Sequence, residues 1–424
     1  MSAIALSMCV LLLAQPNIST GDATPAIDLK AEVNRLVRQL DDNERSQREA
    51  AEKALVELGP GALSLLPVIT PRTPAEVKER LGRVRKTLET TTAESIAQPS
   101  LITLEGQMSL GDALTAMQEQ SGNQVTGYER RSGQVKVAFD RTPYWRALDE
   151  VLDQANLNIN EFGGEASALV LTSRPENQVS RAKTGVYSGV FRLEALRLEA
   201  RRDLRNPAVN GMRLTIGVAW EPRVMPIALR QQLSEITVLD DRGEELSVTG
   251  TQGALNASAE LGMSAVEFGI PLDLASRESK RIASIKGQFT ALVPGRVESF
   301  EFSGIADARD VEQERAGVVV TFERLRKNVD LYEARVALRF DDAANALESH
   351  RGWVYRNEAY LTDKDGKRLE NVGLQATRQG TNEVGIAYLF DLPDGPEGCK
   401  FVYKTPALIL QLPVEYELKD IELP

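Results

Sequence analysis

The sequence predicts a multi-domain α+β protein with a small helical N-terminal unit, a βαββαβ-type domain and two tandem antiparallel β-sandwiches. Three observations lead to this prediction. Apolar residues recur with helical spacing over residues 28–90, strand and helix patterns alternate over 100–173, and strand patterns dominate from residue 186 onward. The chain has 424 residues, which is too long for one ordinary core, so several domains are expected.

A 12-residue apolar run, Ala3 to Ala14, precedes the helical region. It is short for a membrane span and has the length of the apolar core of a signal peptide, although no Lys or Arg precedes it. A terminal strand or a buried helix is the alternative, but nothing amphipathic follows for some 13 residues. We expect residues 1–14 to be a signal peptide. A lipoprotein anchor at Cys9 is disfavoured because Met8 stands where a small residue is needed.

The helical segment, residues 28–90, is expected to contain two amphipathic helices, a short apolar piece and a charged helix. One face of the first helix collects apolar side chains: Leu29, Val33, Leu36, Val37 and Leu40. Gly59-Pro60-Gly61 ends the second helix, since glycine is favoured after a helix C-terminus. The charged helix is expected over residues 74–88, and the polar stretch from Thr90 to Pro99 is expected to be a linker.

The run Arg48-x-x-Ala51-x-x-x-Leu55-x-x-x-Gly59 resembles a HEAT-type helical repeat, in which small residues let paired helices pack closely. The resemblance covers about 60 residues. Because one or two repeats make no long concave groove, a small helical cap and a binding surface are both open interpretations.

Residues 100–173 carry the pattern β-α-β-β-α-β-β. Ser109 is a good N-cap for the first helix, Gly122 ends that helix, and Pro143 stands at the start of the second helix. Alternating apolar residues, such as Val135 and Val137, indicate the strands.

That order, with Ser109-Leu110-x-x-Ala113-Leu114, Val135-x-Val137 and Ala147-Leu148-x-x-x-Leu152, resembles the secretin and TonB short N-terminal (STN) domain. The matching motifs are core positions and carry no chemistry. The resemblance implies a periplasmic domain that binds protein segments. In familiar members a secretin or an outer-membrane barrel follows, and neither follows here, so the fold is implied but transport is not.

Beyond residue 186, four apolar patterns recur in the same order at spacings of roughly 118 to 127 residues. Equal apolar spacing buries equal faces, so we expect separate sandwiches of matching topology at residues 186–308 and 316–424. The predicted equivalent residues are Asp240 and Asp363, Asp273 and Asp391, Gly243 and Gly366, and Pro294 and Pro413. The two glycines are expected in matching turns, and the two prolines at strand ends or edges.

No residue is predicted to be catalytic or to bind a cofactor or a metal. The chain has one histidine, His350, and no second histidine or cysteine pair that would complete a metal site with it. Cys399 is expected to be a buried or half-buried thiol beside a strand, although its neighbour Lys400 could lower its pKa slightly. The segment from Asp363 to Gly366 is similar to a calcium loop, but Leu361 would then occupy the first ligand position, so a polar turn is preferred.

The alternative interpretation is carbohydrate chemistry, either as a binding module or as a two-carboxylate glycoside hydrolase on a β-sandwich. Trp145, Trp220 and Trp353 could form a sugar platform, and carboxylate pairs such as Asp341-Asp342 are numerous. Aromatic residues make up only 5% of the chain, so each tryptophan is expected in a core. This alternative requires tryptophans and carboxylates to converge on one concave face.

The net charge of −11 disfavours nucleic acid and anionic lipid as partners. We therefore expect a non-catalytic, periplasmic or secreted protein of a Gram-negative-type envelope. It would bind or scaffold another envelope protein and would contact the membrane only through the signal segment.

Export is directly testable. The mature protein should begin near Gln15, or a few residues later, and should fractionate with the envelope, because the run from Ala3 to Ala14 has the length of a cleaved signal core. N-terminal sequencing of fractionated protein measures this. Intact Met1 on cytosolic protein would contradict the prediction.

Overall fold

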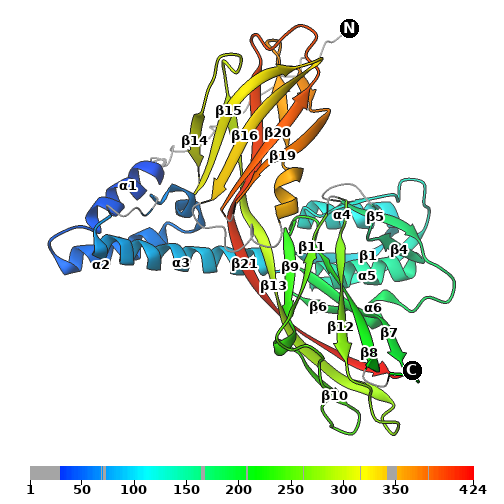
Figure 1. The fold of residues 1–424 in the computed structure, drawn as a ribbon. Helices are drawn as coiled ribbons and strands as arrows, with labels where there is room; N and C mark the ends of the chain where they lie inside the picture. Colours follow the sequence, from blue (N-terminus) through cyan, green and yellow to red (C-terminus); the bar gives the residue numbers. More distant parts are fainter. Residues whose placement is uncertain are drawn as a thin grey trace, which may run out of the picture.

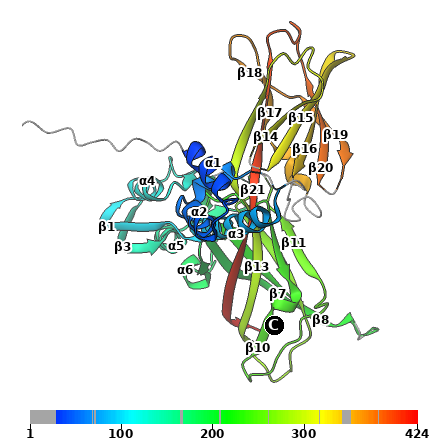
Figure 2. The ribbon, with the colours of Figure 1, turned by 90° about the vertical axis from the view of Figure 1, so that its left-hand side faces the viewer.

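The structure, a computed structural model, describes residues 29–67, 69, 73–163, 168–206, 209–260, 262–315, 317–340, 351–380 and 382–424. The predicted signal segment lies outside these residues. Those described form a mixed α+β protein in which antiparallel strands predominate. The sheets build a long body, and the helical unit and the small α+β domain lie on either side of its middle (Figure 1). After a 90° turn, the helical unit lies in front of that body (Figure 2).

The helical unit consists of α1 (Leu29–Gln39), α2 (Arg45–Glu57), the 3-10 helix η1 (Pro60–Leu65) and α3 (Ala75–Ala97). The apolar face predicted for the first helix is confirmed at Val33 and Leu36, which are buried. These side chains share one core with Leu55 of α2 and Leu81 of α3. The unit therefore packs around its own apolar centre.

Helix α3 is longer than predicted, and the expected linker from Thr90 to Pro99 is wrong because the helix continues to Ala97. The Thr90 and Thr92 hydroxyls donate to carbonyl oxygens one turn earlier, so these polar side chains fit inside the helix. Tertiary contact decides the outcome. Ala93 is buried in a core of the β-sheets, and this burial outweighs the weak helix propensity of threonine.

The small α+β domain has the predicted order of elements. These are β1 (Leu101–Ser109), α4 (Leu110–Ser121), β2 (Gln124–Thr126), β3 (Gln134–Pro143), α5 (Tyr144–Gln154), β4 (Leu157–Asn160) and β5 (Ala168–Ser173). Strand β1 pairs antiparallel with β3, and β5 lies between β4 and β2, parallel to β2. The Ser109 hydroxyl accepts a hydrogen bond from the N–H of Asp112 at 3.1 Å, which confirms the predicted N-cap. Gly122 ends α4 with a φ of 73°, as predicted.

After the short helix α6 (Arg181–Thr184), the chain forms three antiparallel sheets. The first belongs to the first half and has the order β12 (Ala265–Leu272), β8 (Gly211–Trp220), β7 (Phe191–Arg201) and β6 (Val186–Ser188). The second belongs to the second half and has the order β14 (Val311–Arg315), β15 (Val318–Asn328), β16 (Leu331–Phe340), β20 (Glu383–Phe390) and β19 (Gly373–Gln379).

The third sheet draws strands from both halves. Its order is β11 (Ala254–Ser258), β9 (Ala228–Gln232), β13 (Arg281–Phe302), β21 (Lys400–Glu422), β17 (Ala359–Thr362) and β18 (Arg368–Glu370), and β10 (Thr237–Asp240) also pairs with β13. Two 3-10 helices, η3 (Leu233–Glu235) and η4 (Arg351–Arg356), lie in its connections.

Strands β13 and β21 join the two halves. They pair antiparallel from Arg281 opposite Glu422 to Phe302 opposite Phe401. At about 3.3 Å per residue each strand is about 70 Å long. One sheet therefore runs through both halves, and the prediction of two separate sandwiches is wrong. The reason is that each of these strands is long enough to carry apolar side chains into both cores, as Phe289 and Phe302 of β13 do.

Two cores lie against this shared sheet. The lower core in Figure 1 belongs to the first half, where the rings of Phe191 and Phe289 meet edge to face at 5.3 Å. The upper core belongs to the second half, where Phe322 and Phe401 lie 5.4 Å apart. Strand β21 serves both, because Phe401 fills the upper core and Leu418 the lower one.

The predicted matching turns are confirmed. In Asp240 and in Asp363, one carboxylate oxygen accepts backbone N–H bonds from the residues two and four positions later, all at 2.9 Å. Gly243 and Gly366 follow with φ of 81° and 82°. Both positions need the left-handed conformation, which glycine adopts without steric cost.

The strand orders of the two halves also correspond. The order β12-β8-β7 in the first half matches β20-β16-β15 in the second. Asp273 directly follows β12, and Asp391 directly follows β20. Strand β10 pairs with β13 as β17 pairs with β21. The repeated sequence patterns thus reflect matching local structure around one shared sheet.

Pro294 and Pro413, which were predicted at strand ends or edges, lie inside β13 and β21 and not at the strand ends. The Leu292 carbonyl accepts a bond from Ile227 N–H, so it faces away from β21. Alternate residues of a strand turn their backbone groups to the same side, so the nitrogen of Pro294 also faces away from β21. Pairing with β9 has ended at that point. Pro294 is therefore tolerated because no neighbouring strand needs its missing N–H.

Substitution of Gly287 should destabilise the shared ladder. A Cβ at Gly287 would lie 2.5 Å from the hydroxyl oxygen of Tyr416, its partner on β21. We expect Gly287→Ala to lower the free energy of unfolding by about 1–3 kcal/mol in urea titrations. Gly133→Ala is the control, since nothing lies within 4 Å of its Cβ position. If Tyr416→Ala does not abolish the cost of Gly287→Ala, the steric explanation is wrong.

Candidate functional site

The structure separates the side chains singled out in the sequence. His350 and Asp341-Asp342 lie outside the described residues. Cys399 is buried at the edge of the upper core, one residue before β21, as predicted. Burial raises the pKa of its thiol, and the charges of Asp363 and Glu397 raise it further, opposite to the effect expected from Lys400.

The three tryptophans do not gather on one face. Trp145 is buried in the small domain, and its indole N–H donates to the Val190 carbonyl at 3.0 Å. Trp220 and Trp353 come from different halves of the β body and line the same cavity. Only 3% of Trp220 and 6% of Trp353 is exposed, so they form walls and not a platform.

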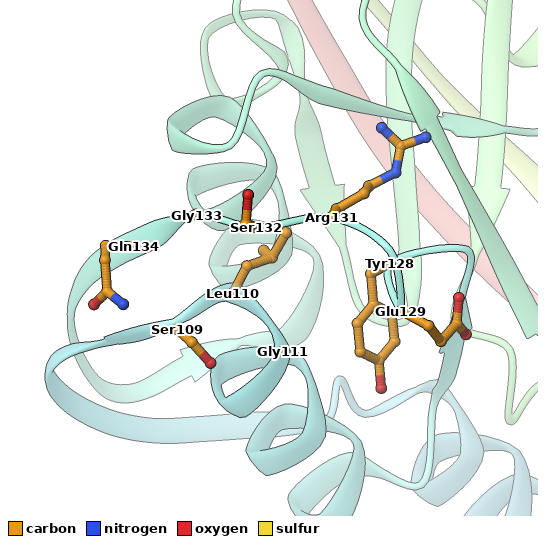
Figure 3. A pocket seen from close by; sticks show the side chains of 9 residues that line it. All are labelled: Ser109, Leu110, Gly111, Tyr128, Glu129, Arg131, Ser132, Gly133 and Gln134. Atoms are coloured by element: carbon orange, nitrogen blue, oxygen red, sulfur yellow. The ribbon is translucent and has the colours of Figure 1, made fainter.

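One open pocket of about 320 Å³ lies on the small domain, between the start of α4 and the loop before β3 (Figure 3). Several of its polar groups already bond within the domain. Arg131 points away from Tyr128 and Glu129, and its Nε donates to the Gly127 carbonyl at 2.9 Å. Leu110 N–H donates to the Gly133 carbonyl at 3.0 Å. This pocket therefore brings together no group with an evident chemical task.

Glutamine side chains satisfy exposed backbone groups of the same domain. The Gln154 amide bonds both the N–H and the carbonyl of Lys136, at 2.9 and 3.1 Å. The Gln120 amide does the same for Thr103, where the β1–β3 ladder is irregular. A strand added beside Lys136 would have to displace Gln154, so this edge is protected against pairing.

The second cavity, which we call the waist pocket, has a volume of about 180 Å³ and lies where the two halves of the β body meet. Most of its lining is apolar, including Trp220, Trp353, Met225 and Val297, and the charged groups in it are Glu260 and Arg356. The guanidinium of Arg356, in the second half, donates to the carbonyl of Ala259, in the first half, at 2.6 Å. This bond links the two halves of the β body at the pocket lining.

A buried ion-pair network fixes the small domain to the first half of the β body. Asp149 of α5 has no exposed surface, and its carboxylate accepts bonds from Arg181 Nε at 2.8 Å and Arg192 Nε at 2.6 Å. The Tyr187 hydroxyl donates to the same carboxylate at 2.9 Å. Burial by itself would lower the pKa of Arg192, but the charges of Asp149 and Glu194 raise it above its usual value.

A second network is centred on Glu221, which follows β8 and is fully buried. Its carboxylate accepts bonds from Ser100 N–H at 2.9 Å, Asn123 Nδ2 at 3.0 Å and Arg223 Nε at 2.7 Å. Ser100 stands just before β1 and Asn123 just before β2. The small domain is therefore attached at two buried polar points, and its orientation on the β body is set by both.

These networks were missed in the sequence, although one signal was present. Asp149 stands within the apolar stripe of α5, between Leu148 and Val151, where a solvated carboxylate is not expected. Its partners Arg181 and Arg192 are more than 30 residues away, so nothing local predicts them.

Comparison with known protein families, with curated proteins and with solved structures finds no match for this chain. No helix in the described part of the chain is long and apolar enough to cross a membrane. Within the same residues, no cluster of three or more His, Cys, Asp or Glu side chains is placed to hold a metal ion.

Removing the central carboxylate should be costly. Asp149→Ala removes the only carboxylate paired with Arg181 among the described residues and leaves Arg192 with Glu194 alone, so we expect a loss of about 3–5 kcal/mol in the free energy of unfolding. Urea titration followed by circular dichroism measures it. Glu150→Ala is the control on the same helix, because its pair with Arg146 is solvent-exposed and should contribute less than about 1 kcal/mol. Equal effects of the two substitutions would contradict this role for Asp149.

Proposed function

We propose that this chain is a non-catalytic, exported envelope protein that binds or scaffolds another protein. The observation that carries the proposal is the waist pocket, an open cavity with apolar walls. Its rim side chains Met225 and Val297 are 41% and 57% exposed. Apolar side chains gathered around a cavity at the surface are typical of interaction sites.

The rigidity of the frame supports a scaffolding role. The shared β13–β21 ladder makes one long body of the two halves, and the networks of Asp149 and Glu221 attach the small domain to it. A protein built this way keeps its surfaces at constant separations, as a spacer or platform for partners requires.

The proposed location in the cell envelope rests on the N-terminal regions. The small domain keeps the order of elements on which the resemblance to STN domains rests, and that family binds protein segments in the periplasm. We assign residues 100–173 to this family, residues 28–90 to a HEAT-like unit and residues 1–14 to a signal peptide. The two strand-rich regions, 186–308 and 316–424, are taken as related sandwich units joined by the shared sheet.

The carbohydrate alternative is favoured by one observation, which is that Trp220, Trp353 and Glu260 line the same cavity. Sugar stacking needs an exposed ring face, however, and both indoles are almost fully buried. A protein partner uses the apolar walls and rim without that requirement, so protein binding is the better-supported function.

The proposed function is tested by pull-down from envelope extract with the mature chain, in parallel with sedimentation on insoluble peptidoglycan. We expect one protein to be recovered in near-stoichiometric amount and no retention on the glycan. Retention on the glycan, with no protein recovered, would favour the carbohydrate alternative and contradict the proposal.

A further inference from the structure

We propose that the waist pocket receives an extended segment of a partner protein, which inserts one large apolar side chain and places a neighbouring carboxylate on Arg356. This inference rests on the proposed function and names its binding site and the chemistry of the partner.

The size and walls of the cavity suit a single side chain. Its volume is about 180 Å³, whereas sites for drug-sized ligands and cofactors usually measure about 300–1,000 Å³. The walls are held in place by the cores behind them, since Trp353 packs edge to face on Phe340 at 5.6 Å and Trp220 belongs to the lower core. An apolar side chain entering this cavity therefore meets preformed walls, which limits the entropic cost of binding.

The rim indicates a polypeptide and not a small molecule. Met225 lies between β8 and β9, and Val297 lies five residues before the end of β13, so apolar surface extends beyond the cavity itself. A small ligand confined to the cavity would cover only the parts of these side chains that line it and would leave the rest of each in water. A chain segment passing over the cavity would cover them and would gain the free energy of burying that apolar area.

The charge of Arg356 determines which charged residue the bound segment should carry. Arg356 is half-buried, and one of its guanidinium nitrogens is held by the Ala259 carbonyl. No carboxylate in the described part of the chain lies within ion-pair distance of it, in contrast to Arg335 and Arg378 of the same half, which pair with glutamates. A half-buried cation that no described carboxylate neutralises is complementary to an incoming carboxylate.

Glu260 restricts the segment further. It lines the same cavity, next in sequence to the residue that anchors Arg356. A second acidic residue on the segment would be repelled there, so the preferred partner carries one carboxylate beside its apolar side chain and not an acidic run. Opposite charges on one rim thus fix the direction in which the segment lies.

The test uses tryptophan fluorescence, because two of the three tryptophans line the cavity. The probes are three capped tetrapeptides: acetyl-Gly-Phe-Asp-Gly-amide, acetyl-Gly-Phe-Lys-Gly-amide and acetyl-Gly-Ala-Asp-Gly-amide. We expect saturable binding of the Phe-Asp peptide to the mature chain. The other two should bind about tenfold more weakly, since each loses either the charge pair or the apolar anchor.

Variants connect binding to the pocket. Arg356→Glu should reverse the preference toward the Phe-Lys peptide, and Arg356→Lys should keep the original preference. Val297→Asp should weaken all three peptides. Leu204→Asp is the matched control, because Leu204 is a 93% exposed apolar side chain of the β7–β8 connection, away from the cavity lining. Thermal unfolding of each variant shows that the fold persists.

Two results would overturn the inference: no saturable binding of the Phe-Asp peptide up to about 5 mM, or the same charge preference in wild type and Arg356→Glu. The pull-down separates this inference from the proposed function. If wild type and the Arg356→Glu, Val297→Asp double variant recover the same partner equally, the pocket assignment is wrong and protein binding stands. If neither recovers a protein partner, the proposed function itself is contradicted.

Discussion

The antiparallel ladder between β13 and β21 is the constraint on which the rest of the structure depends. Each strand contributes side chains to both cores, so each core is completed by a residue from the opposite half of the chain, such as Phe302 in the upper core and Leu418 in the lower one. Neither half can keep its core without the other. The two halves are therefore expected to unfold as one cooperative unit, and the waist between them is a defined surface instead of a mobile joint.

Buried ion pairs fix the small domain to the β body, as the β13–β21 ladder fixes the two halves to each other. An apolar contact alone tolerates sliding, whereas the carboxylates of Asp149 and Glu221 accept several directed bonds that only one orientation satisfies. Such networks add little net stability compared with apolar packing, but breaking them is expensive. Their effect here is to hold the domain in a single position relative to the shared sheet.

The waist pocket follows from both constraints. Pro294, Val297 and Pro406 of the ladder line it, and the bond from Arg356 to the Ala259 carbonyl links the two halves at its lining. Its position at the centre of a rigid body suits a contact that must be kept at a constant distance from the small domain. Binding at this place would also stabilise the junction, because a ligand that binds only the folded protein shifts the folding equilibrium.

Local signals in the sequence determined much of the secondary structure. The N-cap at Ser109, the helix end at Gly122 and the turns at Asp240 and Asp363 all depend on hydrogen bonds within a few residues, so their patterns are visible without the fold. The apolar periods of the helices and strands are equally local.

Only the tertiary structure decided what those elements contact. Strand β13 pairs with β21, and Trp220 meets Trp353, although these residues are far apart in the chain. Helix α3 likewise continues through Thr90 because of contacts with distant residues. Apolar alternation shows which face of a strand is buried, but it does not identify the neighbouring strand. In the same way, no local sequence pattern identifies the partners of a buried carboxylate such as Asp149. Those choices depend on the free energy of the whole packed arrangement, which is not encoded in any single segment.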